Sequence, residues 1–120
     1  MIDPFARSVT NLTGQVRSFQ ANLEREDAAT LARDAGTCET VLKQLCTRVE
    51  QQRVDLNDHY TQLVTITGSL QHAKSDIRQK IEKASWDERP IWMGSLSSVN
   101  TALRLASSLA QQALSRRKFA

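Results

Sequence analysis

Residues that turn or break a helix are scarce in this sequence. It contains four glycines and two prolines among 120 residues, well below the average usage of about 7% and 5%. No stretch sustains the alternation of polar and apolar residues that a strand shows. Because few turn formers leave few places for the chain to reverse, the sequence predicts long helices. Its length predicts one domain, residues 1–120, with a single core.

Aromatic residues and long apolar runs are also few. Aromatics make up 5% of the chain against a total apolar content of 40%, so the core is expected to be aliphatic. No run approaches the ~18 apolar residues of a membrane span, and the first 26 residues lack the apolar stretch of a signal peptide. We therefore expect an intracellular, cytoplasmic protein without direct membrane contact.

Residues that carry chemistry are sparse. His59 and His72 have no cysteine or carboxylate at metal-ligand spacing, and the sequence has no glycine-rich phosphate loop or nucleophile elbow. Cys38 and Cys46 lie about 12 Å apart if they share one helix, which is too far for a disulfide. They are interpreted as buried, unreactive thiols in a reducing compartment. We expect no catalytic residues, cofactor, metal or small-molecule substrate, and hence no enzyme.

The net charge of +3 is concentrated in residues 87–120, which end in Arg116, Arg117 and Lys118. Cations suit the C-terminus of a helix, where they meet the negative end of its dipole. A nucleic-acid-binding segment would be longer and would form a stripe, so we expect no nucleic-acid partner. Weak binding to an anionic surface through this basic end is kept as an alternative, although lipid-binding clusters usually carry four to eight cations.

The first periodic segment predicts a helix over about residues 4–25. Asp3 is a good cap for this helix, and Pro4 fits its first turn. Apolar residues follow in alternating steps of three and four, which makes one continuous stripe. The members of this stripe are Ile2, Phe5, Val9, Leu12, Val16, Phe19 and Leu23.

A second pattern, in a different phase, covers residues 28–85, with Asp27 as its predicted cap. Every first heptad position is apolar, whereas the second position is polar at Gln52, His59 and Lys80. Polar residues in such a seam fix the register of helices at a cost in stability. The first positions are Ala35, Leu42, Val49, Leu56, Leu63, Leu70, Ile77 and Ala84, and the apolar second positions are Leu31, Cys38, Leu45, Ile66 and Ala73.

The stretch VEQQRVDLNDHYTQL, residues 49–63, leaves two interpretations open. A break at Asn57-Asp58, with Asp58 as a cap, gives four helices of similar length, as an antiparallel four-helix bundle requires. The undisturbed heptad phase and the absence of glycine and proline favour one continuous helix of about 55 residues and about 80 Å. The predicted fold is all-α in either case, an antiparallel helical bundle or coiled coil of three or four long helices. We favour the single long helix over residues 28–85.

Residues 86–94 form the one clear loop of the sequence, followed by a predicted helix over 95–117. Ser95 or Ser97 is its expected cap, and its apolar stripe comprises Leu96, Val99, Leu103, Ala106, Ala110 and Ala113. Trp86 and Trp92 are interpreted as closing the end of the bundle. The alternative is an exposed interface knob, because tryptophan is enriched in interface hot spots.

These patterns predict a non-enzymatic protein-protein interaction or scaffold subunit of a larger assembly. Flanking helices of about 33 Å each cannot cover a helix of about 80 Å, so part of its seam would be exposed. An exposed apolar seam is expected to meet a partner helix or a second copy in a homodimer. The predicted seam residues are Leu42, Leu45, Val49, Gln52, Leu56, His59, Leu63, Ile66 and Leu70.

Two features are similar to Q-type SNARE proteins. The tripeptide Asp3-Pro4-Phe5, followed by an amphipathic helix, resembles the opening of the N-terminal regulatory helices in small syntaxins. In residues 49–63, Gln52 interrupts a run of apolar layers, as the central glutamine of a Q-SNARE motif does. The resemblance implies a vesicle-trafficking protein that forms a four-helix zipper, with Gln52 in the central polar layer.

Overall fold

The structure, a computed structural model, describes residues 4–25, 27–52 and 56–119. These residues form four α-helices, α1 (Pro4–Asn22), α2 (Ala28–Gln52), α3 (Tyr60–Lys83) and α4 (Arg89–Phe119), with a short 3-10 helix, η1 (Asn57–His59), before α3. The described part of the chain contains no strand. The prediction of an all-α bundle is therefore confirmed.

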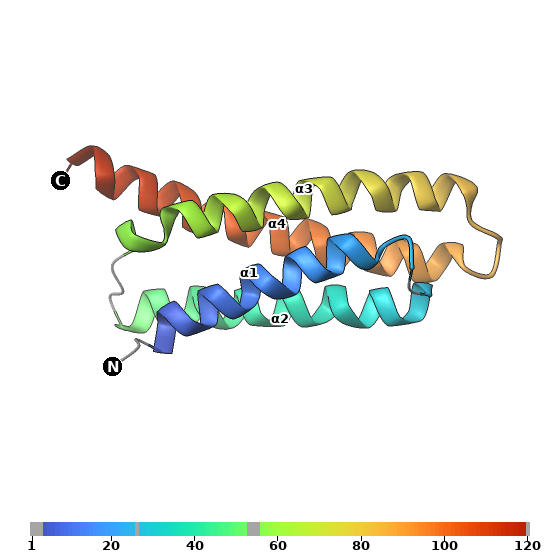
Figure 1. Cartoon of the computed structure of the whole chain (residues 1–120), viewed down its shortest axis with the longest axis horizontal. Helices are drawn as coiled ribbons and strands as arrows, with labels where there is room; N and C mark the ends of the chain where they lie inside the picture. The colour runs from blue at the N-terminus through green and yellow to red at the C-terminus, as the bar shows by residue number, and fades with distance from the viewer. Residues whose placement is uncertain (1–3, 26, 53–55, 120) are drawn as a thin grey trace.

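The helices lie side by side and alternate in direction along the chain (Figure 1). Around the bundle the order is α1, α2, α4, α3, because α2 packs against α4 and α1 packs against α3. Helices α2 and α3 therefore lie diagonally opposite each other in the bundle, although they follow one another in the chain. The molecule measures 51 × 28 × 22 Å. The α3–α4 turn is at one end, and the start of α1 and the end of α4 are at the other.

The apolar stripe of α1 forms one wall of the core. Helix α1 begins at Pro4, where the missing N–H of proline costs no hydrogen bond. It ends at Asn22, followed by a turn over residues 23–25, so it is slightly shorter than expected. Every described member of the predicted stripe is buried: Phe5, Val9, Leu12, Val16, Phe19 and Leu23. Ile2 and Asp3 lie outside the described residues.

Polar contacts among the described residues also hold α1 and the turn after it against neighbouring helices. Arg48 Nη1 of α2 donates to Ser8 Oγ over 3.1 Å, and Gln62 Nε2 of α3 donates to Thr10 Oγ1 over 3.1 Å. At the far end, Lys80 Nζ lies 3.0 Å from Glu24 Oε2 in an ion pair between α3 and the turn after α1. Exposed pairs of this kind contribute little energy, so burial of the stripe is the main source of stability.

The continuous helix over residues 28–85 is wrong. Helix α2 ends at Gln52 and α3 begins at Tyr60, and the whole molecule is 51 Å long, where the long helix alone would need about 80 Å. Folding back at this point buries the seam against α1 and α4, and each buried leucine or isoleucine side chain stabilises the fold by about 1.5–3 kcal/mol. The heptad phase is the same before and after the reversal, so the apolar periodicity of the sequence gives no sign of the turn.

The break also differs in detail from the alternative centred on Asn57-Asp58. Residues 53–55 lie outside the description, and Leu56, already beyond α2, is buried. Asp58 is not the cap of α3; it lies within η1, and His59 occupies the cap position without a side-chain hydrogen bond.

Helix α4 begins six residues earlier than predicted, at Arg89. Ser85 stabilises the turn before it, because the Ser85 carbonyl accepts from the N–H of Arg89 and its hydroxyl accepts from the N–H of Glu88. Pro90 then occupies the first turn, where proline is tolerated. The predicted caps are wrong as well: Ser95 is buried inside the helix. Pro90 and Gly94 therefore lie within α4 and not in a loop.

Candidate functional site

The predicted seam lies inside this chain's own core. Its apolar members share that core with the stripe of α1 and with α4, and the side chain of Gln52 lies outside the described residues. The prediction that these residues meet a partner helix stays a prediction, since in this structure the chain's own helices cover them. The buried members are Leu42, Leu45, Val49, Leu56, His59, Leu63, Ile66 and Leu70.

His59 is a structural residue in this arrangement. Its imidazole is buried and lies edge-on to the ring of Phe5, with 5.2 Å between the ring centroids. Such contacts between rings are worth about 0.5–1.5 kcal/mol beyond burial. This contact joins η1 to the start of α1. His59, one of the polar residues at the second heptad position, therefore helps to close one end of the bundle.

The two cysteines are free thiols on α2. Burial raises the pKa of the Cys38 thiol to about 11, and the nearby Asp34 carboxylate adds to the effect. Partial burial, with Glu50 nearby, also raises the pKa of Cys46. A nucleophilic cysteine needs a lowered pKa, because the thiolate is the reactive form. Both environments therefore work against thiol chemistry. The prediction of a buried thiol is confirmed for Cys38, whereas Cys46 is only partly buried.

The two tryptophans have opposite environments. Trp92 is 6% exposed and lies in the core, as expected for a residue that closes the bundle, whereas Trp86 is 83% exposed in the turn between α3 and α4. A shallow groove of about 220 Å³ beside this turn is lined by Trp86, Arg89, Pro90 and Met93. We call the residues 84–93 the tip. It presents an indole and a thioether to solvent at the end of two packed helices.

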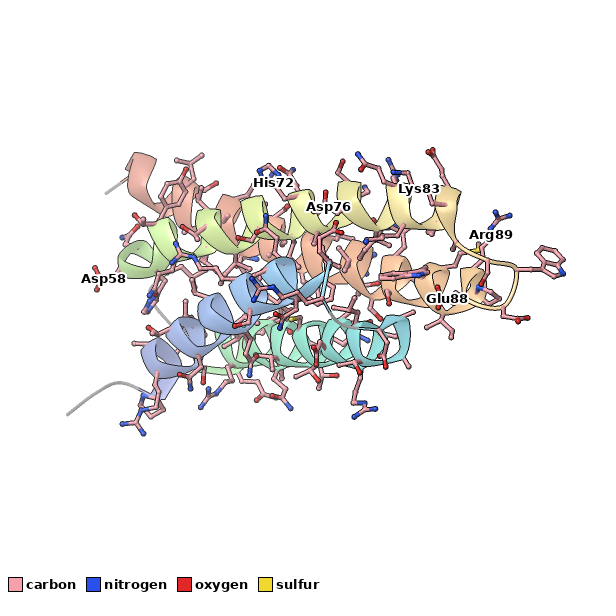
Figure 2. All side chains as sticks on the ribbon, turned by 45° about the vertical axis from the view of Figure 1, so that its right-hand side comes forward. Asp58, His72, Asp76, Lys83, Glu88 and Arg89 are labelled. Carbon is pink, nitrogen blue, oxygen red and sulfur yellow. The ribbon has the colours of Figure 1, made fainter. Side chains whose placement is uncertain are left out.

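Charged residues of both signs lie in the tip and directly before it. Figure 2 shows Lys83, Glu88 and Arg89 gathered at this end of the bundle, with Asp58 at the opposite end. Among the described residues, the ion pairs are Lys43–Glu39 and Lys80–Glu24, so the charges of the tip have no partner there. The Nε atom of Arg89 is buried without a hydrogen-bond partner within the described part of the chain.

Exposed apolar side chains are confined to one half of the bundle. Every large hydrophobic residue that the described part of the chain exposes lies on α3, on α4 or in the turn between them: Val64, Trp86, Ile91, Met93 and Leu114. Sequence reasoning named Trp86 alone. The exposure of Met93 could have been predicted, because neighbouring residues of a helix point in different directions and Met93 directly follows the buried Trp92.

Other classes of site receive no support from the described residues. No group of three or more histidine, cysteine, aspartate or glutamate residues could hold a metal ion there, and no described helix is long and apolar enough to span a bilayer. The basic residues Arg116, Arg117 and Lys118 lie in the last turn of α4, but their side chains are outside the description. No family model matches this chain, and no curated protein or solved structure matches it significantly.

Proposed function

We propose that this chain is a non-enzymatic interaction module of a larger assembly and that it docks a partner protein on the tip. The exposed indole of Trp86 carries the proposal. Tryptophan offers a large apolar surface and a single N–H donor, and interface hot spots are enriched in it. A partner with an apolar socket would remove this surface from water, at about 25 cal/mol per Å² of apolar area.

The helices on either side of the tip hold the backbone of Trp86 in place. Trp86 lies in a short turn between two helices that pack against each other, and Trp92, in the first turns of α4, is buried in the core. A side chain on a rigid support loses little conformational freedom when it binds, so more of the contact energy remains as affinity. The same indole on a long, loose loop would bind more weakly.

The unpaired charges of the tip supply selectivity. Asp87, Glu88 and Arg89 belong to the tip and Lys83 directly precedes it, so charged residues accompany the exposed apolar side chains, as they do in the polar rim of an interface. Charges of both signs at fixed positions favour a partner with the reverse arrangement and oppose others, because juxtaposed like charges are costly. We therefore expect one specific protein partner rather than general adhesion to apolar surfaces.

The proposal can be tested by affinity purification of the chain from its native cells and identification of the proteins that are recovered with it. Proteins recovered with the parent should be lost with Trp86→Ala and retained with Arg17→Ala, an exposed change on α1 that serves as the matched control. A protein recovered equally well with Trp86→Ala would not be a partner of the tip. If every recovered protein behaves in that way, the proposal fails.

A purified partner then allows a direct measurement. In a Trp92→Phe background, tryptophan emission comes from Trp86 alone, since the chain has two tryptophans. We expect the emission to shift to shorter wavelength as the partner is added. We also expect Trp86→Ala to weaken the affinity at least about tenfold, in line with hot-spot costs of about 2 kcal/mol or more. An unchanged emission spectrum at saturation would contradict docking on the tip.

The SNARE-like zipper remains a prediction with a clear structural requirement. Its layers would use Val49, Leu56 and Leu63, which are buried in the chain's own core. The bundle would have to open before those residues could meet other chains. Cooperative thermal unfolding of the isolated chain supports the interaction module, whereas a loosely helical chain that folds only with partner helices would support the zipper.

A further inference from the structure

The groove of the tip combines an apolar surface with one cation. It has a volume of about 220 Å³, and three of its four lining residues have apolar side chains. The fourth is Arg89, whereas Asp87 and Glu88 belong to the tip but do not line the groove. A ligand in this groove therefore meets an apolar surface with a guanidinium beside it. The apolar lining residues are Trp86, Pro90 and Met93.

The position of Arg89 does not favour the stability of the chain. Arg89 is partly buried, and its Nε atom is buried without a hydrogen-bond partner in the described part of the chain. It belongs to neither of the ion pairs found among the same residues. It is also the first residue of α4, where a cation meets the positive end of the helix dipole, and a buried donor without an acceptor is costly. An anion supplied by a partner would remove both costs.

The size of the groove fits a side chain of a protein better than a small molecule. Sites for small molecules usually have volumes of about 300–1,000 Å³, which is more than this groove offers. A large apolar side chain packed against Trp86 and Met93 removes apolar surface of both molecules from water, which is favourable. It also removes water from the guanidinium of Arg89, because Arg89 lines the same groove.

This loss of water separates a neutral partner from an acidic one. A cation that leaves water without gaining a counter-charge carries a large desolvation penalty. A carboxylate offsets the penalty, and its two oxygens can accept two parallel hydrogen bonds from one guanidinium. A neutral partner with the same apolar side chain would leave the charge of Arg89 uncompensated, so it would bind more weakly.

We infer that the tip binds a protein segment in which an aspartate or glutamate lies beside a large apolar side chain. The inference rests on the proposed docking of a partner on the tip and adds the chemistry of that partner. The apolar side chain occupies the groove, and the carboxylate pairs with Arg89. Asp87 and Glu88 are exposed and lie between Trp86 and Arg89 in the sequence. Because juxtaposed like charges are costly, a single carboxylate is favoured over a run of acidic residues.

Random peptides displayed on phage test the inference. They are selected on the immobilised parent chain, and peptides that also bind Trp86→Ala are removed. The remaining peptides should be enriched in aspartate or glutamate beside leucine, isoleucine, methionine or an aromatic residue. Peptides that need Trp86 but carry no acidic residue would overturn the inference and leave docking on the tip intact. Recovery of no peptide that needs Trp86 would also overturn the inference, while the proteins recovered with the parent chain still test docking by itself.

A synthetic copy of a selected peptide then tests the contact with Arg89. Arg89→Gln should weaken its binding at least about tenfold, and so should replacement of the acidic residue of the peptide by its amide. The two changes together should weaken binding little more than either change alone, because each removes the same ion pair. Arg104→Gln is the matched control, because Arg104 is an exposed arginine of α4 outside the groove.

Two measurements separate a lost contact from a folding defect. Circular dichroism should show the helical content of the parent in Arg89→Gln, because this change removes a disfavoured cation from the start of α4. The amide peptide is measured on the parent chain, so its result does not depend on the folding of a variant. The inference is overturned if the parent binds the acidic and the amide peptide equally well, or if Arg89→Gln binds the acidic peptide as well as Arg104→Gln does.

Discussion

At the scale of single residues, the buried thiols make the first prediction. Alkylation by iodoacetamide near neutral pH should modify Cys46 first, because Cys46 is partly exposed and Cys38 is buried. The thiolate of Cys38 is disfavoured twice, by burial and by Asp34, which together raise its pKa to about 11. Mass spectrometry of timed samples measures both sites. A Cys38 rate in the folded chain that equals the rate of Cys46 and does not increase in urea would show that Cys38 is not protected.

The raised pKa of Cys38 also predicts a dependence of stability on pH. The unfolded chain releases the thiol proton near the ordinary value of 9.0, whereas the folded chain holds it until about 11. Because the folded state then binds more protons, the free energy of unfolding should fall as the pH rises through that window. The decline should be shallower in Cys38→Ala than in the parent. Identical profiles in alkaline denaturant titrations would contradict it.

Asp27 predicts the opposite dependence of stability on pH, a loss of stability as the pH falls. Hydrogen bonds from the Thr30 side chain and backbone lower the pKa of this exposed carboxylate below 3.8, and the Thr30 N–H lies 2.7 Å from Asp27 Oδ1. The stabilisation is present above pH 3.8 and is lost as the pH falls through the lower folded-state pKa. Asp27→Ala should therefore melt at a lower temperature than the parent at pH 7 and lose that difference in strong acid. Asp27→Asn, which keeps a cap acceptor, should be less affected at pH 7.

At the scale of elements, the reversal between α2 and α3 makes a prediction about Leu56. This side chain is fully buried although it lies outside any helix. Leu56→Ala should lower the free energy of unfolding by about 2–5 kcal/mol, as expected for a buried leucine that leaves a cavity. The exposed Val64→Ala should change it by no more than about 0.5 kcal/mol. Urea titrations followed by circular dichroism compare the two, and equal midpoints would mean that the connection does not pack on the core.

The elements also show what the sequence could and could not predict. The stripe of α1 and the cap at Asp27 follow from local periodicity and hydrogen bonding, and both are present. The reversal before Tyr60 was missed because it depends on burying the seam between α2 and α3 against α1 and α4, a tertiary effect that no local signal carries. Pro90 was misread because proline is compatible both with a loop and with the first turn of a helix.

At the scale of the whole molecule, the candidate surfaces were harder to predict than the core. Trp86 and Trp92 are the same residue type six positions apart, and only the position of α4 separates an exposed side chain from a buried one. The groove between α3 and α4, lined from Val64 to Gln71 on one side and from Ser107 to Gln111 on the other, depends on the pairing of the two helices, since neither helix forms it alone.

The central claim is that one chain buries its own seam in a compact bundle. Small-angle X-ray scattering, extrapolated to zero concentration with the mass taken from the forward scattering, tests this most directly. We expect a monomer with a radius of gyration close to the 15.1 Å of the structure, apart from the contribution of its hydration layer. A particle of dimer mass at zero concentration, with a radius well above about 20 Å, beyond the ~14 Å typical of a compact domain of this length, would contradict the claim. Residues 49–63 would then run through as one helix whose seam is shared with another chain.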